Sequence, residues 1–397
     1  MMKLRNVPTS LISIVYRALL RRVRIGSVRV RIDGLAPITG TGDGPGPSAD
    51  LTIHQPAAVL RKLVRGGGVG FAEAYLAGDW DTEDLPLALE ALGLNLDSYL
   101  RSSRPNRVIR WVRKLWQRIV TRRRSEIPSI GDHYNLGNEF YTAWLDKTMT
   151  YSSAVFTDQA TTLSQAQTEK YRRLAELADL KADDHVLEIG CGWGGFAEYA
   201  ATEIGCRVTG ITLSTEQAEY ARDRLKTAGV DHLTDIKLLD FRDETGTYDK
   251  IVSIEMIESI PADLWPALFT TISENLRPGG RVAMQAITIA DDLYESLLDR
   301  DDFISKHIFP GGALPSVATL RSLAIDNGLR VTSTDPHALS YAVTLQKWRE
   351  RFEESWQRLR QEDLDERFRR TWRYYLAYCE AGFRIGRIDV HQVAFVR

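Results

Sequence analysis

The chain has few cysteines, and none of them is spaced for a metal site or a disulfide. Cys191, Cys206 and Cys379 are the only three in 397 residues, which fits a protein of the reducing cytoplasm. No stretch reaches the roughly 18 apolar residues that a transmembrane helix needs. These absences argue against a disulfide scaffold, a cysteine-bound metal and a membrane-spanning protein.

Charge is divided unevenly along the chain, although the net charge is only −2. Residues 1–124 contain 21 Lys and Arg against 10 Asp and Glu, so they carry +11 and the remainder carries −13. Within this part, residues 101–124 contain ten basic residues and no acidic ones, interleaved with apolar residues at helical spacing. The pattern predicts a basic amphipathic helix that packs on its own protein or on an anionic phospholipid surface. Its apolar stripe argues against nucleic acid as a partner.

Length and charge together predict two domains. We assign residues 1–100 to an N-terminal α+β domain that faces lipid, 101–129 to the basic linker helix and 130–397 to a catalytic domain. Residues 7–20 are apolar, but arginines interrupt and follow them without a small-residue cleavage site. We therefore expect a surface helix rather than a signal peptide, and a cytoplasmic protein bound peripherally to the inner face of the membrane.

The second part of the chain alternates between strand and helix patterns. Strands are predicted at residues 185–189, 207–212, 235–239, 250–254 and 280–285, with an edge strand at 390–396. Each of the first five precedes a helical stretch, which indicates an α/β fold with a doubly wound, mostly parallel sheet. Ligands bind such sheets at the carboxyl ends of the strands.

A glycine turn follows the first of these strands. Residues 187–195 read LEIGCGWGG, so Glu188 comes just before a turn formed by Gly190, Gly192 and Gly194. Glycines let the backbone turn tightly and approach a ligand closely. A GxGxG run alone is weak evidence, but this one lies between a predicted strand and a helix. The arrangement is typical of nucleotide binding.

The position of the nearby acidic residue identifies the nucleotide more closely. A dinucleotide site usually carries an acid at the tip of the second strand, where this chain has Thr212 and Leu213. An acid instead follows the third strand, at Asp240. This favours S-adenosylmethionine over a nicotinamide cofactor.

Taken together, several separated motifs resemble the cyclopropane fatty acid synthase family, in its long bacterial form. They are HYNLGN at 133–138, MTYSSA at 149–154, the glycine turn, FPGGALPS at 309–316, AGFR at 381–384 and, in the N-terminal part, GFAEAY at 70–75. The resemblance implies a seven-stranded methyltransferase sheet. It also implies methyl transfer from S-adenosylmethionine to the cis double bond of an acyl chain in a membrane phospholipid.

The resemblance assigns the cofactor residues to five places in the sequence. Tyr151 and Ser152 would lie near the methionine end, above the glycine turn with Glu188. Thr212, Leu213 and Gln217 would face the ribose region, and Asp240 with Phe241 the adenine. A carboxylate at Asp240 can accept the adenine amino hydrogen, and the alternative is a cap at the strand end.

The catalytic base is also given by resemblance. Synthases of this family hold a bicarbonate ion with a cysteine, a glutamate, a histidine, a backbone isoleucine and a tyrosine. Here Glu258, Ile287 and Tyr341 keep the glutamate, the isoleucine and the tyrosine. Ser153 replaces the cysteine, and Gln285 replaces the histidine. Serine and glutamine still donate hydrogen bonds, so bicarbonate remains a second expected ligand. Alternatively Glu258 accepts the proton itself, or it is a buried carboxylate paired with Tyr341.

These substitutions leave the product and some partners open. The pattern of Ser153, Glu255 and Gln285 looks like an actinobacterial branch of the family, some members of which make methylene or methyl-branched chains. We favour a branched product over a cyclopropane. A separate reductase would saturate a methylene branch. A homodimer is one option for the oligomeric state. Two other functions stay open: a small-molecule S-adenosylmethionine methyltransferase and a lipid-binding protein whose catalytic centre has decayed.

Overall fold

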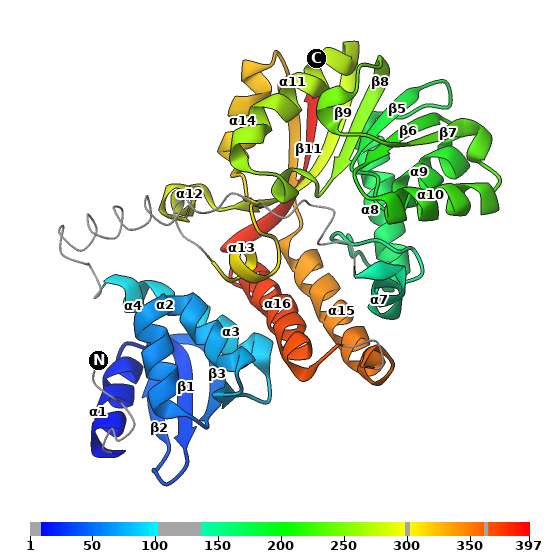
Figure 1. The fold of residues 1–397 in the computed structure, drawn as a ribbon. Helices are drawn as coiled ribbons and strands as arrows, with labels where there is room; N and C mark the ends of the chain where they lie inside the picture. The colour runs from blue at the N-terminus through cyan, green and yellow to red at the C-terminus, as the bar shows by residue number, and fades with distance from the viewer. Residues whose placement is uncertain (1–8, 102–135, 298–301, 361–363) are drawn as a thin grey trace. The chain divides into compact units, whose positions relative to one another are not determined.

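The computed structural model describes residues 9–101, 136–297, 302–360 and 364–397. The chain divides into two compact units (Figure 1). The N-terminal unit comprises Met1–Pro128, Asp301–His307 and Leu364–Ile385, and the C-terminal unit comprises Ser129–Arg300, Ile308–Asp363 and Gly386–Arg397. The predicted linker helix at 101–129 lies almost entirely outside the described residues.

The units differ from the predicted domains because two late segments pack with the N-terminal part. Helix α16 (Glu366–Arg384) contacts α2 (Pro56–Leu76) and α3 (Leu85–Leu94). The Arg370 guanidinium lies 4.1 Å from the centre of the Tyr75 ring and 2.7 Å from the Asp81 carboxylate. The sequence predicts one domain over residues 130–397, whereas these contacts join residues too far apart in sequence for local patterns to reveal.

The C-terminal unit is built on a seven-stranded sheet with the order β10-β11-β9-β8-β5-β6-β7. Strands β5 to β9 pair in parallel, and β11 runs antiparallel to both of its neighbours, β9 and the edge strand β10. This confirms the predicted α/β fold with a mostly parallel sheet. The strands are β5 (His185–Ile189), β6 (Arg207–Thr212), β7 (Thr234–Leu238), β8 (Tyr248–Ile254), β9 (Leu276–Ile289), β10 (Arg330–Pro336) and β11 (Ile388–Val396).

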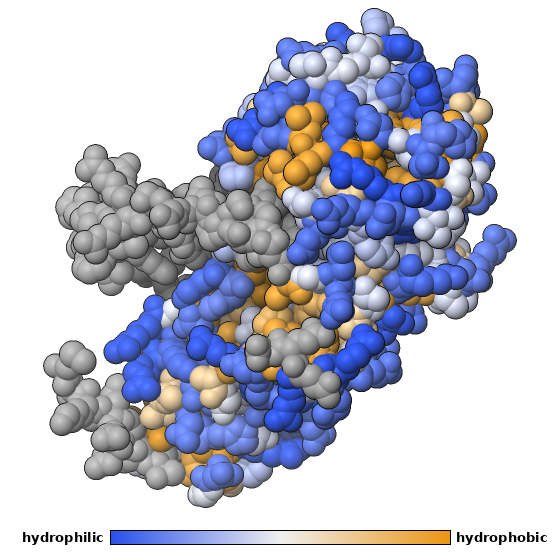
Figure 2. All heavy atoms as spheres, turned by 45° about the vertical axis from the view of Figure 1, so that its right-hand side comes forward, coloured by the Kyte–Doolittle hydropathy of each residue, from blue (hydrophilic) through white to orange (hydrophobic). Residues whose placement is uncertain are grey.

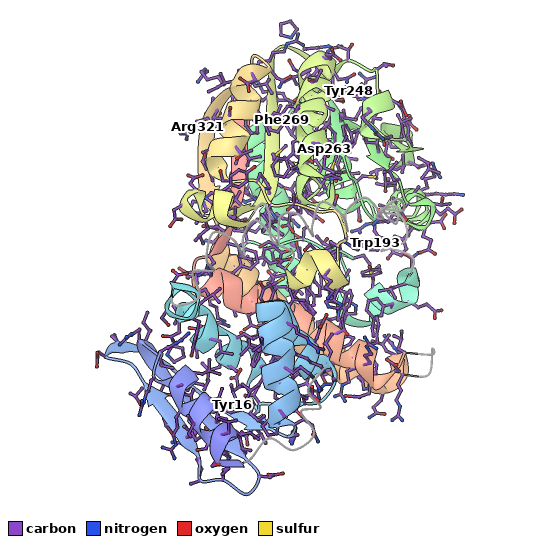
Figure 3. The ribbon with its side chains drawn as sticks, turned by 60° about the vertical axis from the view of Figure 1, so that its left-hand side comes forward. Tyr16, Trp193, Tyr248, Asp263, Phe269 and Arg321 are labelled. Atoms are coloured by element: carbon purple, nitrogen blue, oxygen red, sulfur yellow. The ribbon has the colours of Figure 1, made fainter. Side chains whose placement is uncertain are left out.

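Alternate residues of these strands supply two hydrophobic cores, one on each face of the sheet. Leu187 and Ile251 pack with α11 (Trp265–Asn275) and α14 (Val317–Asp326). Their neighbours Val186 and Val252 pack with α8 (Leu163–Ala178), α9 (Gly195–Tyr199) and α10 (Thr215–Thr227) (Figure 1). Burial on both faces explains why β5 and β8 each carry consecutive apolar residues, at 186–187 and 251–252. Tyr248 and Phe269, labelled in Figure 3, belong to the first of these cores.

The helices of this unit follow the predicted βαβ order. Ser214 caps α10 by accepting a hydrogen bond from the backbone N–H of Gln217 at 3.3 Å, as the serine before a helical pattern predicts. The helices are α7 (Gly137–Trp144), α8 (Leu163–Ala178), α9 (Gly195–Tyr199), α10 (Thr215–Thr227), α11 (Trp265–Asn275), α12 (Asp291–Leu297), α14 (Val317–Asp326) and α15 (Ala338–Leu359). Short turns of η2 (Ala200–Ile204), η3 (Asp231–Leu233), η4 (Phe241–Asp243), η5 (Ile257–Ser259) and η6 (Ala262–Leu264) connect them.

The N-terminal unit has a four-stranded mixed sheet with the order β2-β1-β3-β4. Asn95 ties its first strand to the helices, since its side chain bonds the backbone of Arg24 and Ile25. The elements are α1 (Thr9–Leu20), β1 (Ile25–Ile32), β2 (Ile38–Thr41), β3 (Gly44–Ile53), α2, β4 (Trp80–Asp81), α3, α4 (Leu96–Arg101), α13 (Phe303–His307) and α16. Helix α2 is kinked at Gly67, where the backbone leaves helical geometry.

Helix α1 has the amphipathic character predicted for the start of the chain. Ile12, Tyr16 and Leu20 are buried, whereas Leu11 and Ile14 are 49% and 62% exposed. Apolar areas also show between the mostly hydrophilic residues of the surface in Figure 2. Among the described residues, none of the helices combines the length and the apolar composition that crossing a bilayer requires.

Candidate active site

The glycine turn after β5 has the conformation that its composition predicts. Gly190, Gly192 and Gly194 have φ angles of +82°, +53° and +79°, which L-residues rarely adopt. Side chains added to the first and third would approach Met256 and Ala221 to 2.9 and 3.0 Å, whereas one on Gly192 would meet nothing within 4 Å. The middle of the turn therefore faces open space, and its backbone is accessible to a ligand.

Glu188 lies on β5 directly before this turn. The residue is 2% exposed, and burial raises the pKa of its carboxyl to about 8. The carboxylate is hydrogen-bonded by the backbone of Ala197, but its Oε2 atom has no hydrogen-bond partner among the described residues. A shielded acceptor of this kind is suited to an amino or hydroxyl group of a ligand.

The end of β6 brings together two of the three residues predicted to face the ribose. The Thr212 hydroxyl donates to the side-chain amide oxygen of Gln217 at 2.9 Å, and both residues are buried. Leu213 stands between them in sequence, but its side chain is 49% exposed. The structure thus pairs Thr212 with Gln217 and directs Leu213 toward solvent.

Asp240 follows β7 and is bonded to Arg242. Its carboxylate accepts the backbone N–H of Arg242 at 2.9 Å and two guanidinium hydrogen bonds at 2.9 and 2.8 Å. Arg242 lowers the pKa of Asp240, which favours the ionised form. The predicted cap at the strand end is therefore present. A carboxylate has about four acceptor positions, so one remains for a ligand, while the neighbouring Phe241 is buried in the core.

Tyr151 and Trp193 join a cluster of aromatic rings. The Tyr151 ring centre lies 5.4 Å from those of Trp144 and Trp348 and 5.6 Å from that of Tyr141. Trp193, in the glycine turn (Figure 3), lies 5.0 Å from the Tyr141 ring. The cluster connects the MTYSSA motif to the glycine turn. Residues 133–135 of the HYNLGN motif lie outside the described residues.

Glu255 follows β8 and accepts hydrogen bonds from three directions. The backbone N–H of Ser153 and the Gln285 side-chain amide donate to its Oε1 atom at 2.7 and 2.8 Å, and the Tyr341 hydroxyl donates to Oε2 at 2.7 Å. Tyr341 therefore pairs with Glu255, not with Glu258. Burial raises the pKa of Glu255, and the three donors oppose that rise because they stabilise the charged form.

Glu258 lies on the next turn and is bonded on one side only. Its Oε1 atom accepts the backbone N–H of Ile287 at 2.9 Å, whereas Oε2 is shielded from solvent and has no hydrogen-bond partner among the described residues. Burial and the charge of Glu255 raise the pKa of Glu258 to about 8. The FPGGALPS motif packs on its backbone, since a side chain on Gly312 would lie 2.6 Å from the Glu258 carbonyl oxygen.

The Gln285 amide is fixed in orientation by a second glutamine. Gln392 on β11 donates to the Gln285 amide oxygen at 2.9 Å, so the Gln285 NH2 group points at Glu255 and at the Ser153 carbonyl. The Ser153 hydroxyl donates to the Ala154 carbonyl at 2.9 Å. Ser153 therefore offers its backbone N–H to the site, and not the hydroxyl group expected from the sequence.

Lys170 on α8 belongs to the site, and our sequence reasoning missed it. It is 0% exposed and donates to the Ser152 hydroxyl at 2.6 Å. Burial lowers the pKa of Lys170 to about 7, while the charges of Glu255, Asp146 and Glu188 act in the opposite direction. One signal was available in the sequence: Lys170 lies at helical spacing on the apolar face of α8, where lysine is rarely found without a partner.

The bicarbonate expected by resemblance does not fit the residues present. The groups that would donate hydrogen bonds to bicarbonate, at Ser153, Gln285 and Tyr341, all donate to the Glu255 carboxylate. A second anion in this place would lie against the Glu255 carboxylate, which already takes up these three donors.

Several known proteins have similar sequences and folds. The sequence profile of the mycolic acid cyclopropane synthetase family matches residues 121–393. The chain is 39% identical over 383 residues to the tuberculostearic acid methyltransferase UfaA1 of Mycobacterium tuberculosis, covering 92% of this chain and 86% of that protein. It is 33% identical over 368 residues to the cyclopropane-fatty-acyl-phospholipid synthase of Escherichia coli K12, covering 91% of each.

A solved structure extends the likeness to the fold. The mycolic acid cyclopropane synthase CmaA1, complexed with SAH and CTAB, superimposes with a TM-score of 0.64 and 28% identity, covering 68% of this chain and 99% of that one. The residues matched by the family profile, 121–393, include the sheet strands β5 to β10 and the glycine turn on which the cofactor prediction depends. The chain therefore belongs to the mycolic acid cyclopropane synthetase family and is an S-adenosylmethionine-dependent methyltransferase.

Proposed function

We propose that the protein transfers a methyl group from S-adenosylmethionine to the cis double bond of an acyl chain in a membrane phospholipid. The observation that carries this proposal is the pair of buried carboxylates, Glu255 and Glu258, just after the carboxyl end of β8. An alkene is a weak nucleophile, and its methylation leaves a carbocation that needs a negative charge and a proton acceptor away from water. Methylation of an amine creates no carbocation, so a small-molecule methyltransferase would not need this pair.

The residues proposed to hold the cofactor lie at or just after the ends of β5, β6 and β7, in α10, and in the segment between α7 and α8. They are Tyr151, Ser152, Glu188, Gly190, Gly192, Gly194, Thr212, Leu213, Gln217, Asp240 and Phe241. When bound, S-adenosylmethionine supplies an electrophilic methyl group on a sulfonium centre, and the alkene becomes a methylated carbocation. Open space beside Gly192 and the free acceptors on Glu188 and Asp240 support this assignment.

Glu258 is the proposed proton acceptor. Its unpaired Oε2 atom is available for a proton, while the Ile287 N–H fixes the other oxygen at 2.9 Å. As a C–H bond of the carbocation breaks, its electron pair stays on carbon and the proton ends on Oε2. The negative charge of Glu255 acts on this step. That charge is held in place by hydrogen bonds from Gln285, Ser153 and Tyr341.

The product depends on which C–H bond breaks. Loss of a proton from the transferred methyl group closes a cyclopropane, whereas a hydride shift before proton loss gives a methylene branch. We favour the branched product, which a separate reductase would saturate. In support, the named relatives include a tuberculostearic acid methyltransferase at 39% identity and a cyclopropane synthase at 33%.

The substrate lies in a membrane, and the N-terminal unit offers a surface to meet it. Leu11 and Ile14 are exposed on α1, and the exposed Arg17, Arg21 and Arg24 follow within the same helix and the next turn. Apolar side chains beside arginines suit the boundary between acyl chains and anionic headgroups. We propose peripheral binding to the inner face of the membrane.

The test is incubation of the full chain with S-adenosylmethionine and vesicles of a monounsaturated phospholipid, followed by mass spectrometry and proton NMR of the released acids. We expect a gain of one CH2 and the proton signals of a C=CH2 branch on the acyl chain. A gain of CH2 with cyclopropane signals would reject the branched product only. An unchanged acyl mass would reject the proposed function and favour a decayed lipid-binding protein.

A further inference from the structure

Three donors from distant parts of the chain form an anion site around Glu255. The Ser153 N–H, the Gln285 amide and the Tyr341 hydroxyl donate to the two carboxylate oxygens at 2.7, 2.8 and 2.7 Å. Hydrogen bonds of this kind stabilise the ionised form of a carboxylate. Gln392 prevents the Gln285 amide from turning its acceptor oxygen toward the site, because that oxygen is occupied.

The same three positions would hold bicarbonate by resemblance, but here a side chain takes up their donors. We propose that Glu255 is the active-site anion of this enzyme, and that its methyl transfer requires no bicarbonate. This assignment rests on the proposed function, since it names the charge that stabilises the carbocation on the acyl chain. Glu255 provides the fixed negative charge, and Glu258, with its unpaired Oε2 atom, takes the proton.

The backbone at Glu255 supports this assignment independently. Its φ angle is +50°, a left-handed conformation that costs a non-glycine residue roughly 1–2 kcal/mol. Strain of this kind persists where surrounding contacts fix the residue, and it is concentrated at functional sites. Here the three donors fix the carboxylate. Burial raises the pKa of Glu255, and the positive charge of the buried Lys170 and the three donors oppose that rise.

The first experiment compares the wild-type protein in buffer purged of carbon dioxide and in the same buffer with added sodium bicarbonate. Sodium chloride at equal ionic strength is the control. We expect the rate of acyl methylation to differ by less than about twofold, because the anion site is already filled. A rate that falls severalfold on purging and returns with bicarbonate would overturn the assignment.

The second experiment empties the site with Glu255→Gly, which removes the carboxylate and tolerates the positive φ angle. We expect the rate to fall about 100-fold or more and to recover in part on addition of formate or bicarbonate. Asp179→Gly is the matched control, since Asp179 is also an acidic residue with a positive φ angle, at +53°, but 48% of its side chain is exposed. It should keep the wild-type rate.

A third readout needs no turnover. Formate or bicarbonate should raise the melting temperature of Glu255→Gly above the value in chloride, and should leave wild type and Asp179→Gly unchanged. An equal rise in wild type, or none in Glu255→Gly, would overturn the assignment. If wild type methylates no acyl chain in either buffer, the proposed function fails, and the melting temperatures still decide whether Glu255 fills the anion site.

Glu255→Gln covers the case in which the glycine variant does not fold. The amide has the shape of the carboxylate without its charge, so we expect a similar loss of rate that no added anion restores. Wild-type activity of Glu255→Gln in purged buffer would contradict the assignment.

Discussion

The two sides of the site are assembled in different ways. On the cofactor side, contacts are local: Thr212 bonds Gln217, five residues away, and Asp240 bonds Arg242, two residues away. On the carboxylate side, the donors to Glu255 are 102, 30 and 86 residues distant. A chain can therefore keep a common cofactor site while a few distant substitutions change the charges that decide the product.

Glu258→Gln is the change that should separate the two sides most clearly. Because it removes the proposed proton acceptor and keeps the shape of the side chain, we expect the rate to fall about 10²–10⁴-fold. Binding of S-adenosylmethionine, measured by calorimetry, should be nearly unchanged. The control is Glu354→Gln, an exposed glutamate on α15. Near wild-type activity of Glu258→Gln would remove this residue from the mechanism.

The pH dependence should report the same carboxylate. Glu258 accepts a proton only when ionised, and its pKa is raised to about 8, so the rate should rise about tenfold per pH unit below 8 and then level off. Because folding raises this pKa, the protonated Glu258 contributes most to the stability of the folded protein at low pH. This contribution is lost as the pH rises through 8. Glu255 and Lys170 titrate nearby, and the charge of Glu255 raises the Glu258 pKa.

Glu255→Gln should therefore move the rising limb of that profile to lower pH. The shift is measured from the pH dependence of the variant's residual rate. The infrared band of the protonated Glu258 carboxyl group, followed against pH, is a second measure. A limb at the same pH in both proteins would show that Glu255 does not act on Glu258.

The sequence was a good guide to the cofactor side and a partial one to the carboxylate side. Strand patterns and the glycine turn depend on neighbouring residues, so β5 and β6 begin and end where predicted. Tyr341 can pair with either Glu255 or Glu258, which are only three residues apart on a short turn. The sequence pattern does not show which of the two reaches the Tyr341 hydroxyl. Lys170 was missed because its partners lie on other elements, and the grouping of α16 with the N-terminal unit was missed for the same reason.

Asp240→Asn examines the cofactor side with a smaller expected effect. Asparagine keeps an acceptor for the Arg242 backbone but loses the charge, so we expect S-adenosylmethionine to bind up to about tenfold more weakly. The rate at saturating cofactor should stay close to that of wild type. Asp243→Asn, in the same turn and exposed, is the matched control. Unchanged affinity in Asp240→Asn would leave Asp240 as a cap alone.

Gly192→Ala should have the smallest effect and the sharpest control. Its φ angle of +53° strains any other residue, but the added methyl group meets no protein atom within 4 Å. Gly229 has a φ angle of +75° and equally open surroundings, but it follows α10 outside the proposed site. Both alanine variants should lose roughly 1–2 kcal/mol of unfolding free energy in denaturant titrations. Only Gly192→Ala should also weaken cofactor binding, by severalfold, because its methyl group enters the space assigned to S-adenosylmethionine. Equal affinities in the two variants would mean that Gly192 serves the turn and not the ligand.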